Sequence, residues 1–556
     1  MDKTSELPTE ILHQILSLLP TKTAARTAVL SKSWFKAYST NPNLCFDESN
    51  FVDFRGQFLS LIDTTLERYR CDDNLSISAF NLCISLSDQS GGCDDLVDKW
   101  LDIITQKRAS KISLFVKCES DSITERYNLL VDIILAMEFT QQLVLNHCNI
   151  LLLKLTTLLH EDEIMCRNLK DITLCYVAVS ESALDSLISC CPQIQMISLQ
   201  YCIGFSGIRV SRNLPNLLSL SILCCTIVDV HIVDAPKMIS FEYVNKGDSE
   251  PYLSQYMCLR TLKIGTCQNL RRVEFVKIAF GSRFLFEIIK KLHSIKELIL
   301  HHCPYLRKMK IESSTLEVCS IGECDSLVQA VFDVPKLLSL AFSNQYRLPS
   351  LSFESASSQC RISINYDDIL WDAEPFIHLR RYLVVLNDQV VDLAFGITSY
   401  RNRINKCLRE ASGVGHLPTP EVENLILSDH EYYLSELSYS TYFDDIFWTC
   451  SPKSLTVLQC SRRFRKFLRQ QLLNNCHWRL TKCTWKDYLL YSQIEYKKRV
   501  EDDWVTLNRK KLRGNPRIIE DIHTIRFTQT QEQEKNKQSF ISSANCVPSS
   551  LNFHIE

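Results

Sequence analysis

The sequence predicts a mixed α/β protein in which three short N-terminal helices precede a repeat solenoid built on a parallel sheet. Apolar residues recur at helical spacing within residues 5–38, where proline and serine interrupt them. From about residue 140, strand-like segments with alternating apolar residues recur at intervals that are mostly 19 to 29 residues long. At 556 residues the chain is long enough for several domains or one repeat array.

The N-terminal unit is predicted to contain three helices. Ile11, Ile15 and Leu19 share one face of the first helix, which Pro8 and Pro20 bound because proline fits a first turn and stops a helix interior.

Thr21 is expected to cap a second helix that runs through Leu30, and Ser31 a third helix that carries Trp34. A unit of this size cannot bury so many large side chains internally, so we expect part of the set to dock on another protein.

The order of these residues resembles an F-box of the plant type. Residues 7–20 read as Leu-Pro, Ile-Leu, Ile-Leu and Leu-Pro pairs, and residues 25–34 read ARTAVLSKSW, with Ser33 where a basic residue is usual. The resemblance implies docking on the Skp-type adaptor, and through it on the cullin and RING subunits of an SCF-type E3 ubiquitin ligase. Carried over by motif, the adaptor-binding residues are Leu7, Pro8, Ile11, Leu12, Ile15, Leu16, Leu19, Pro20, Ala25, Val29, Leu30 and Trp34. The motif does not say which of them face the adaptor and which face inward.

The segment that follows is predicted to alternate helix and strand. After a turn at 41–43, helical periodicity covers 51–69 and 96–109, and strand patterns cover 75–85 and 111–116.

One template then repeats: two apolar residues lie two apart, and a cysteine or small apolar residue follows three positions later. The copies are residues 143–148, 172–177, 197–202, 220–225, 262–267, 298–303 and 319–324, with weaker copies at 239–244 and 340–345. Each copy is expected to add one strand to a parallel sheet, to point alternate side chains into the core, and to turn the chain inward at its last position. Helices are expected on the return path at 180–190 and 280–292.

With these repeats, the chain resembles the plant F-box/leucine-rich-repeat family. The resemblance implies a substrate receptor whose repeats hold an unknown target protein for ubiquitination. The template positions Asn146, Gln200, Lys263, His301 and Gly322 are candidates for the target-facing surface. The alternative is a leucine-rich-repeat scaffold that binds proteins outside a ligase complex.

The C-terminal part fits the template less well. Residues 346–420 match it poorly and suggest loops, the repeat returns at 422–430, and 446–458 resembles a closing strand of the same family. A terminal strand or cap is expected at 476–496, because the last repeat of a solenoid has no neighbour.

The expected domains are therefore an F-box at 1–45, a capped solenoid at 46–500 and a charged, disordered tail at 501–556. Basic residues between 497 and 513 form either a nuclear import signal or a solvated surface.

Composition argues against other classes of protein. The net charge of −2 gives no indication of nucleic acid or membrane binding, and no apolar run reaches the length of a bilayer span. The N-terminus lacks the pattern of a secretory signal, so we expect an intracellular protein of the nucleus, the cytoplasm or both. The 25 cysteines are then expected to be reduced and mostly buried.

No catalytic or metal site is predicted. The sequence contains no C-x-x-C spacing and no glycine-rich phosphate loop. His301-His302-Cys303 and Cys476-His477 are the best local clusters, but nothing in the sequence selects one of them as a metal site or as a cysteine nucleophile with its base. We therefore expect a protein that is not an enzyme and needs no cofactor.

Overall fold

The structure is a computed structural model of the whole chain. The residues it describes are 7–19, 21–51, 55–86, 93–118, 126–152, 166–210, 214–225, 227, 229–245, 259, 261–343, 347–356, 360–366, 374–386, 389–396, 419–428, 436–458, 461–473, 492–498, 505–506 and 522–529. By compactness the chain divides into one unit of Met1–Ile299 with Cys303–Leu306, and a second of Leu300–His302 with Arg307–Glu556. Within the described residues, no helix combines the length and apolar character needed to cross a membrane.

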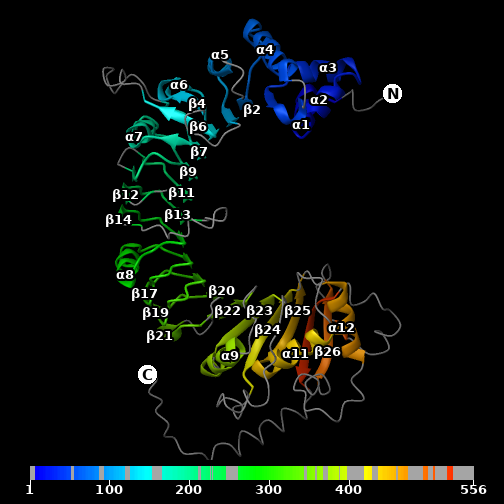
Figure 1. Cartoon of the computed structure of the whole chain (residues 1–556), viewed down its shortest axis with the longest axis vertical. Helices are drawn as coiled ribbons and strands as arrows, with labels where there is room; N and C mark the ends of the chain where they lie inside the picture. The colour runs from blue at the N-terminus through cyan, green and yellow to red at the C-terminus, as the bar shows by residue number, and fades with distance from the viewer. Residues whose placement is uncertain are drawn as a thin grey trace, which may run out of the picture. The chain divides into compact units, whose positions relative to one another are not determined.

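The first unit begins with the predicted three helices, coloured dark blue in Figure 1. Its helices are α1 (Thr9–Ser17), α2 (Thr21–Thr27), α3 (Lys32–Ser39), the 3-10 turn η2 (Glu48–Phe51), α4 (Arg55–Cys71), α5 (Cys93–Gln106), α6 (Val131–Leu135), α7 (Glu181–Ser189) and α8 (Ser282–Lys291). The helices α7 and α8 confirm the two that the sequence predicts on the return path.

The main sheet of the first unit is parallel, as predicted, and each strand pairs with that of the next repeat. In spatial order its strands are β1 (Asn43–Asp47), β2 (Ala79–Leu86), β3 (Lys111–Cys118), β5 (Gln142–Asn146), β7 (Asp171–Cys175), β9 (Met196–Gln200), β11 (Ser219–Leu223), β13 (Ser240–Val244) and β15 (Arg272–Val276). Alternate side chains of these strands are buried, as Ile172 and Leu174 of β7 and Ile197 and Leu199 of β9 show. In Figure 1 the labels β7 to β13 follow one another down this stack.

Short second strands line the return path. One small parallel sheet contains β4 (Tyr127–Leu130), β6 (Cys148–Leu151) and β8 (Ala178–Val179), and another contains β10 (Gly207–Val210), β12 (Asp229–Asp234) and β14 (Thr261–Thr266).

Here one prediction was wrong. The copy at 262–267 is β14 of a small sheet, whereas the main-sheet strand of that repeat is β15, which the template missed. Both sheets point alternate apolar residues into the same core, so the alternation alone does not separate them.

The cysteine position of the template turns the chain from one sheet to the other. The residue before it has a positive φ in seven repeats, among them His147 (57°), Tyr176 (51°) and Tyr201 (52°). Cys148 and Cys202, which come directly after such residues, are buried. The predicted inward turn is thus confirmed, and it uses the left-handed conformation that few non-glycine residues adopt.

β16 (Glu297–His301) spans the division between the units. The second unit has a small sheet of β17 (Lys308–Glu312), β19 (Gln329–Val334) and β21 (Ser350–Ala356), and a parallel series of β18 (Val318–Gly322), β20 (Ser339–Ser343), β22 (Arg361–Tyr366), β23 (Val390–Gly396), β24 (Glu421–Ser428) and β25 (Ser451–Leu458). Its helices are α9 (Glu374–Val385), α11 (Glu436–Thr449) and α12 (Arg462–Leu473).

The repeat does not stop at residue 346. The strands β22 and β23 continue the series in parallel register through the region that fits the template poorly, and β24 lies where the repeat is predicted to return. β25 forms only the later part of the closing strand predicted at 446–458, because the first residues of that range belong to α11. The long connections that hold α9 and α11 hide this continuity in the sequence, because they break the spacing between strands.

The end of the sheet corrects the expected tail. β28 (Ile522–Gln529) pairs antiparallel with β25 and with β26 (Ser492–Lys498), and β26 pairs with β27 (Val505–Thr506). Ile525 of β28 is fully buried. These residues are therefore ordered, because β28 covers an edge of β25 that would otherwise be open. The segments 507–521 and 530–556 lie outside the described residues, and the boundaries at 45 and 500 stay predictions.

Candidate docking surface

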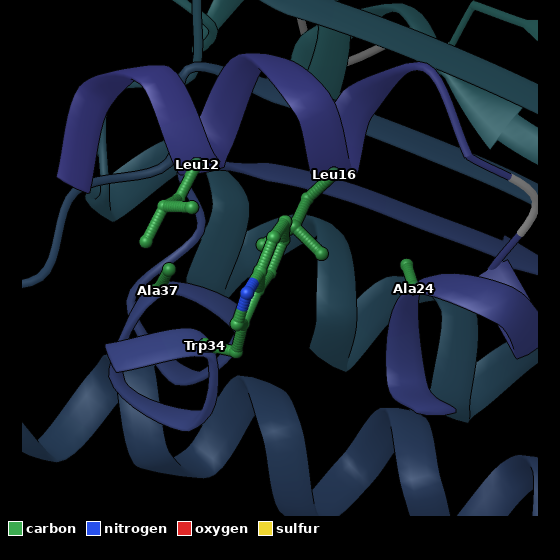
Figure 2. Packing of buried hydrophobic residues seen from close by; sticks show 5 residues of the cluster. All are labelled: Leu12, Leu16, Ala24, Trp34 and Ala37. Carbon is green, nitrogen blue, oxygen red and sulfur yellow. The ribbon is translucent and has the colours of Figure 1, made fainter. Parts of the chain in front are cut away.

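The three N-terminal helices enclose a small apolar core. Leu12 and Leu16 of α1 meet Ala24 of α2 and Trp34 and Ala37 of α3, and all five are buried (Figure 2). In Figure 2 the indole of Trp34 lies between α1 and α3 and extends toward Leu16. Leu7, Ile15, Leu19 and Tyr38 pack against this cluster and are partly buried.

Local chemistry sets the ends of these helices. Pro8 immediately precedes α1, and its carbonyl accepts hydrogen bonds from the Ile11 and Leu12 N–H groups, both at 3.1 Å. Ser31 caps α3 as predicted, with its Oγ accepting a hydrogen bond from the Trp34 N–H at 3.3 Å.

Val29 and Leu30 follow α2 rather than lie in it. The helix ends at Thr27, and the Val29 and Leu30 N–H groups donate to the Arg26 and Thr27 carbonyls in a tighter turn. The predicted second helix is therefore shorter than expected, and this turn carries both side chains outward. Val29 is 86% exposed.

The motif residues thus divide into three groups. The buried residues are Leu12, Leu16 and Trp34; the partly buried residues are Leu7, Ile15 and Leu19; and the exposed residues are Pro8, Ile11, Ala25, Val29 and Leu30. Pro20 lies outside the described residues.

Two exposed apolar residues were absent from the predicted set. Leu18 is 84% exposed and Phe35 is also exposed. Leu18 directly follows α1, and Phe35 adjoins the buried Trp34 on α3. Each is therefore next to a motif residue in the sequence, but its side chain faces solvent instead of the helical core. A helical plot of α3 separates Phe35 from the core face, and this is the signal that identifies it from sequence.

Polar groups accompany these apolar side chains. Arg26, Lys32 and Lys36 are exposed on α2 and α3. His13 Nε2 lies 3.2 Å from Thr40 Oγ1, and burial lowers the pKa of the imidazole, against smaller effects of the Ala37 backbone and Glu10 that raise it. Exposed apolar side chains with charged side chains around them are typical of a protein-binding surface.

The cysteine and histidine clusters have other surroundings. His301 Nε2 lies 3.1 Å from Ser320 Oγ, whereas His302 Nε2 lies 2.5 Å from Glu323 Oε2. Cys303 is buried. Among the described residues, no three metal-binding side chains come together, and Cys476-His477 lies outside those residues.

Many template cysteines act as small core residues, as predicted. Cys148, Cys202, Cys225 and Cys324 are buried free thiols. Burial raises the pKa of Cys148 to about 12, so its sulfur stays protonated and poorly nucleophilic at neutral pH.

Of the template positions suggested for target contact, Asn146 and Gln200 lie half-buried on β5 and β9, and His301 lies on β16. Gly322 is buried against His301 and Ser343. Lys263 lies on β14 and so belongs to a small sheet.

Comparison with known proteins agrees with this arrangement. Residues 4–37 match the F-box domain family, and residues 97–251 match the family described as "FBD-associated F-box protein At5g56370, LRR repeats".

Similar curated proteins come from Arabidopsis thaliana. F-box/LRR-repeat protein At5g02910 is 27% identical over 38% of this chain and 42% of its own length. Putative F-box/LRR-repeat protein At3g18150 is 24% identical over 63% of this chain and 68% of its own length. F-box/LRR-repeat protein At3g58940 is 35% identical over 22% of this chain and 21% of its own length. Of these three, the chain spans more than half the length of At3g18150 alone.

The three-helix core, the parallel strand series and these matches lead to one conclusion. The chain carries an N-terminal F-box followed by a leucine-rich-repeat region, the combination found in the F-box/LRR-repeat proteins of Arabidopsis.

Proposed function

We propose that this protein is a substrate-recognition subunit of an SCF-type E3 ubiquitin ligase. Its F-box docks on a Skp-type adaptor, which connects it to the cullin and RING subunits, and its repeats bind a target protein. The observation that carries the proposal is the set of exposed apolar residues on the F-box. Val29, Leu30 and Leu18 are large side chains held in water by a unit whose own core is already filled.

The mechanism is positional. The receptor holds the target near the activated ubiquitin carrier, so that transfer to a target lysine becomes effectively intramolecular. The chain needs no catalytic residue or cofactor for this role. The ligase assembly works in the nucleus or the cytoplasm, the two locations expected from the sequence.

The buried motif residues have a supporting role in this proposal. Leu12, Leu16 and Trp34 hold the helices in place, and Ile11, Val29 and Leu30, together with Leu18 and Phe35, supply the contact surface. The docking energy is then concentrated on a few side chains, as in most protein interfaces.

Co-purification with a plant Skp-type adaptor and cullin tests the proposal. We expect the full-length chain to retain both, and Val29→Asp to lose both because a carboxylate would be desolvated at the interface. Val385→Asp is the matched control, since Val385 is a similarly exposed valine on α9. If Val29→Asp binds the adaptor as the unaltered chain does, this docking surface is wrong.

A scaffold that acts outside a ligase is the second candidate. It shares the repeat surface but does not predict adaptor and cullin in the purified complex. Absence of both from the unaltered chain would favour it.

A further inference from the structure

A row of aromatic side chains follows the C-terminal ends of successive main-sheet strands in the first unit. His147, Tyr176 and Tyr201 occupy the same position in successive repeats, directly after β5, β7 and β9. Each has a φ between 51° and 57°. Their N–H groups donate to the carbonyls of Cys175, Gln200 and Leu223 in the next repeat, at 2.8 to 3.0 Å. Identical backbone conformation and bonding make the three side chains project in parallel.

The rings stack as a result. The His147 and Tyr176 ring centroids are 4.7 Å apart, and the Tyr176 and Tyr201 rings are 4.6 Å apart and inclined by only 3°. These distances match the spacing of about 4.8 Å between neighbouring strands. Phe115 adds an edge-on contact with His147 at 5.3 Å. We call these four residues the aromatic ladder.

The ladder is accessible and its backbone is braced. Tyr176 is 37% exposed, and the other three rings are half-buried. Arg126 Nη1 donates to the Tyr176 carbonyl at 2.8 Å. The left-handed φ of the repeat turn fixes the direction in which His147, Tyr176 and Tyr201 leave the sheet. The exposed edges of the stacked rings form parallel ridges, against which the side chains of an extended peptide can pack.

The same sheet carries a group of carboxylates. Arg272 lies 2.8 Å from Glu274, 2.6 Å from Glu297 and 3.8 Å from Glu242. We call these four residues the acidic cluster; one guanidinium against three carboxylates leaves it negative.

Arg272 pairs with each carboxylate of the cluster but supplies only one positive charge against three negative ones. Glu242 and Glu274 are register partners on β13 and β15, and like charges directly opposite each other weaken a sheet. All three carboxylates remain between 21% and 34% exposed. They are therefore able to meet a cation from outside the chain.

The distance between the two features suits a short peptide. Glu242 is in register with Ser221 and Ser198, two strands from β9, and Tyr201 lies three residues beyond Ser198. At about 4.8 Å per strand and 3.3 Å per residue, the ladder and the cluster lie about 14 Å apart, which about four extended residues span.

We propose that the aromatic ladder and the acidic cluster together bind an extended segment of the target protein. A proline or aliphatic side chain of that segment packs on the ring edges, and an arginine or lysine about four residues away pairs with Glu242, Glu274 and Glu297. The proposal rests on the proposed function only in assigning the peptide to a target; peptide binding itself is measured without adaptor or ligase.

The test uses the full-length chain and synthetic peptides in which one proline and one arginine are separated by a systematically varied serine and alanine spacer. Fluorescence anisotropy should show tightest binding near a spacing of about four residues. Replacing the peptide arginine by glutamate should weaken binding about tenfold or more. Equal binding of the two peptides, or no binding at any spacing, would overturn the proposal.

Variants of the chain complete the test. Tyr176→Asn removes a ring while keeping a residue that tolerates positive φ, and it should weaken binding at least about fivefold. Glu274→Lys should reduce binding of the arginine peptide and favour the glutamate peptide. The controls are Tyr305→Asn, an exposed tyrosine outside the ladder, and Asp325→Lys, an exposed turn residue.

Each variant is first checked for unchanged thermal unfolding. If Tyr176→Asn and Glu274→Lys bind the peptides as the controls do, the surface is wrongly assigned. Adaptor co-purification is measured in parallel. Retained adaptor with no peptide binding would reject this surface alone, whereas loss of adaptor from the unaltered chain would reject the proposed function.

Discussion

The Ser31 hydroxyl accepts a hydrogen bond from the Trp34 N–H at 3.3 Å, so the residue that begins α3 also orients the turn that carries the buried indole. This contact joins the cap of the helix to the core of the F-box. Ser31, which the sequence identifies as a cap, and Trp34, which it identifies as a motif residue, thus serve the same structure.

Trp34→Ala should unfold the F-box rather than merely weaken its surface. Trp34 is 5% exposed and fills the space between α1 and α3, and loss of a buried aromatic side chain typically costs about 3–5 kcal/mol. Limited proteolysis should then cut within residues 7–40, and adaptor binding should disappear. Val29→Asp should lose the adaptor without becoming protease-sensitive. A protease-resistant Trp34→Ala variant would contradict the core assignment.

Removal of residues 515–556 should lower the stability of the second unit. The deletion removes β28, whose Ile525 is buried and whose backbone pairs with both β25 and β26. Thermal unfolding should show a lower midpoint for the deletion than for a control that removes only residues after 535. Equal midpoints would show that β28 adds nothing to the sheet.

Gly204 and Gly56 should respond oppositely to alanine. Gly204 has a φ of +98°, and a Cβ there would lie 2.7 Å from the Val179 carbonyl oxygen. Gly204→Ala should therefore destabilise the first unit by about 1–3 kcal/mol. A Cβ at Gly56 of α4 meets nothing within 4 Å, and Gly56→Ala should stabilise the helix by about 0.5–1 kcal/mol. Chemical denaturation measures both, and a neutral Gly204→Ala would contradict the close backbone approach.

Asp392 should make stability depend on pH. Burial raises the pKa of its carboxyl, against the opposing effect of Arg361, whose Nε lies 3.3 Å away. Because the folded pKa exceeds the unfolded one, the folded state binds the proton more tightly, and stability falls as pH rises through the folded pKa.

Asp392→Asn should therefore stabilise the protein at neutral pH and lose this advantage in acid, below the unfolded pKa. Thermal unfolding of both forms across this range is the measurement. Arg361→Gln is the control for the ion pair, since it keeps the buried carboxyl and should reduce stability at neutral pH. An advantage of Asp392→Asn that is independent of pH would contradict the assignment.

Helix ends and strand alternation were predictable because they depend on neighbouring residues. Ser31 and Pro8 mark helix starts through their own hydrogen-bonding capacity. The repeat beyond residue 346 was missed because α9 and α11 lengthen the connections. The ordered β28 was missed because its polar surroundings resemble a tail, and its partner β25 lies about seventy residues earlier in the sequence.

The amino-acid sequence by itself determined the F-box motif, the parallel repeat and the inward turn at each cysteine, because local spacing and side-chain chemistry are sufficient for these features. Tertiary structure alone decided which motif residues are core and which are exposed, since Leu12 and Ile11 are adjacent and equally apolar but point in different directions. It also placed β14 in a small sheet and stacked Tyr176 on Tyr201. Those relations depend on distances between repeats, which the chain acquires only when its strands lie side by side.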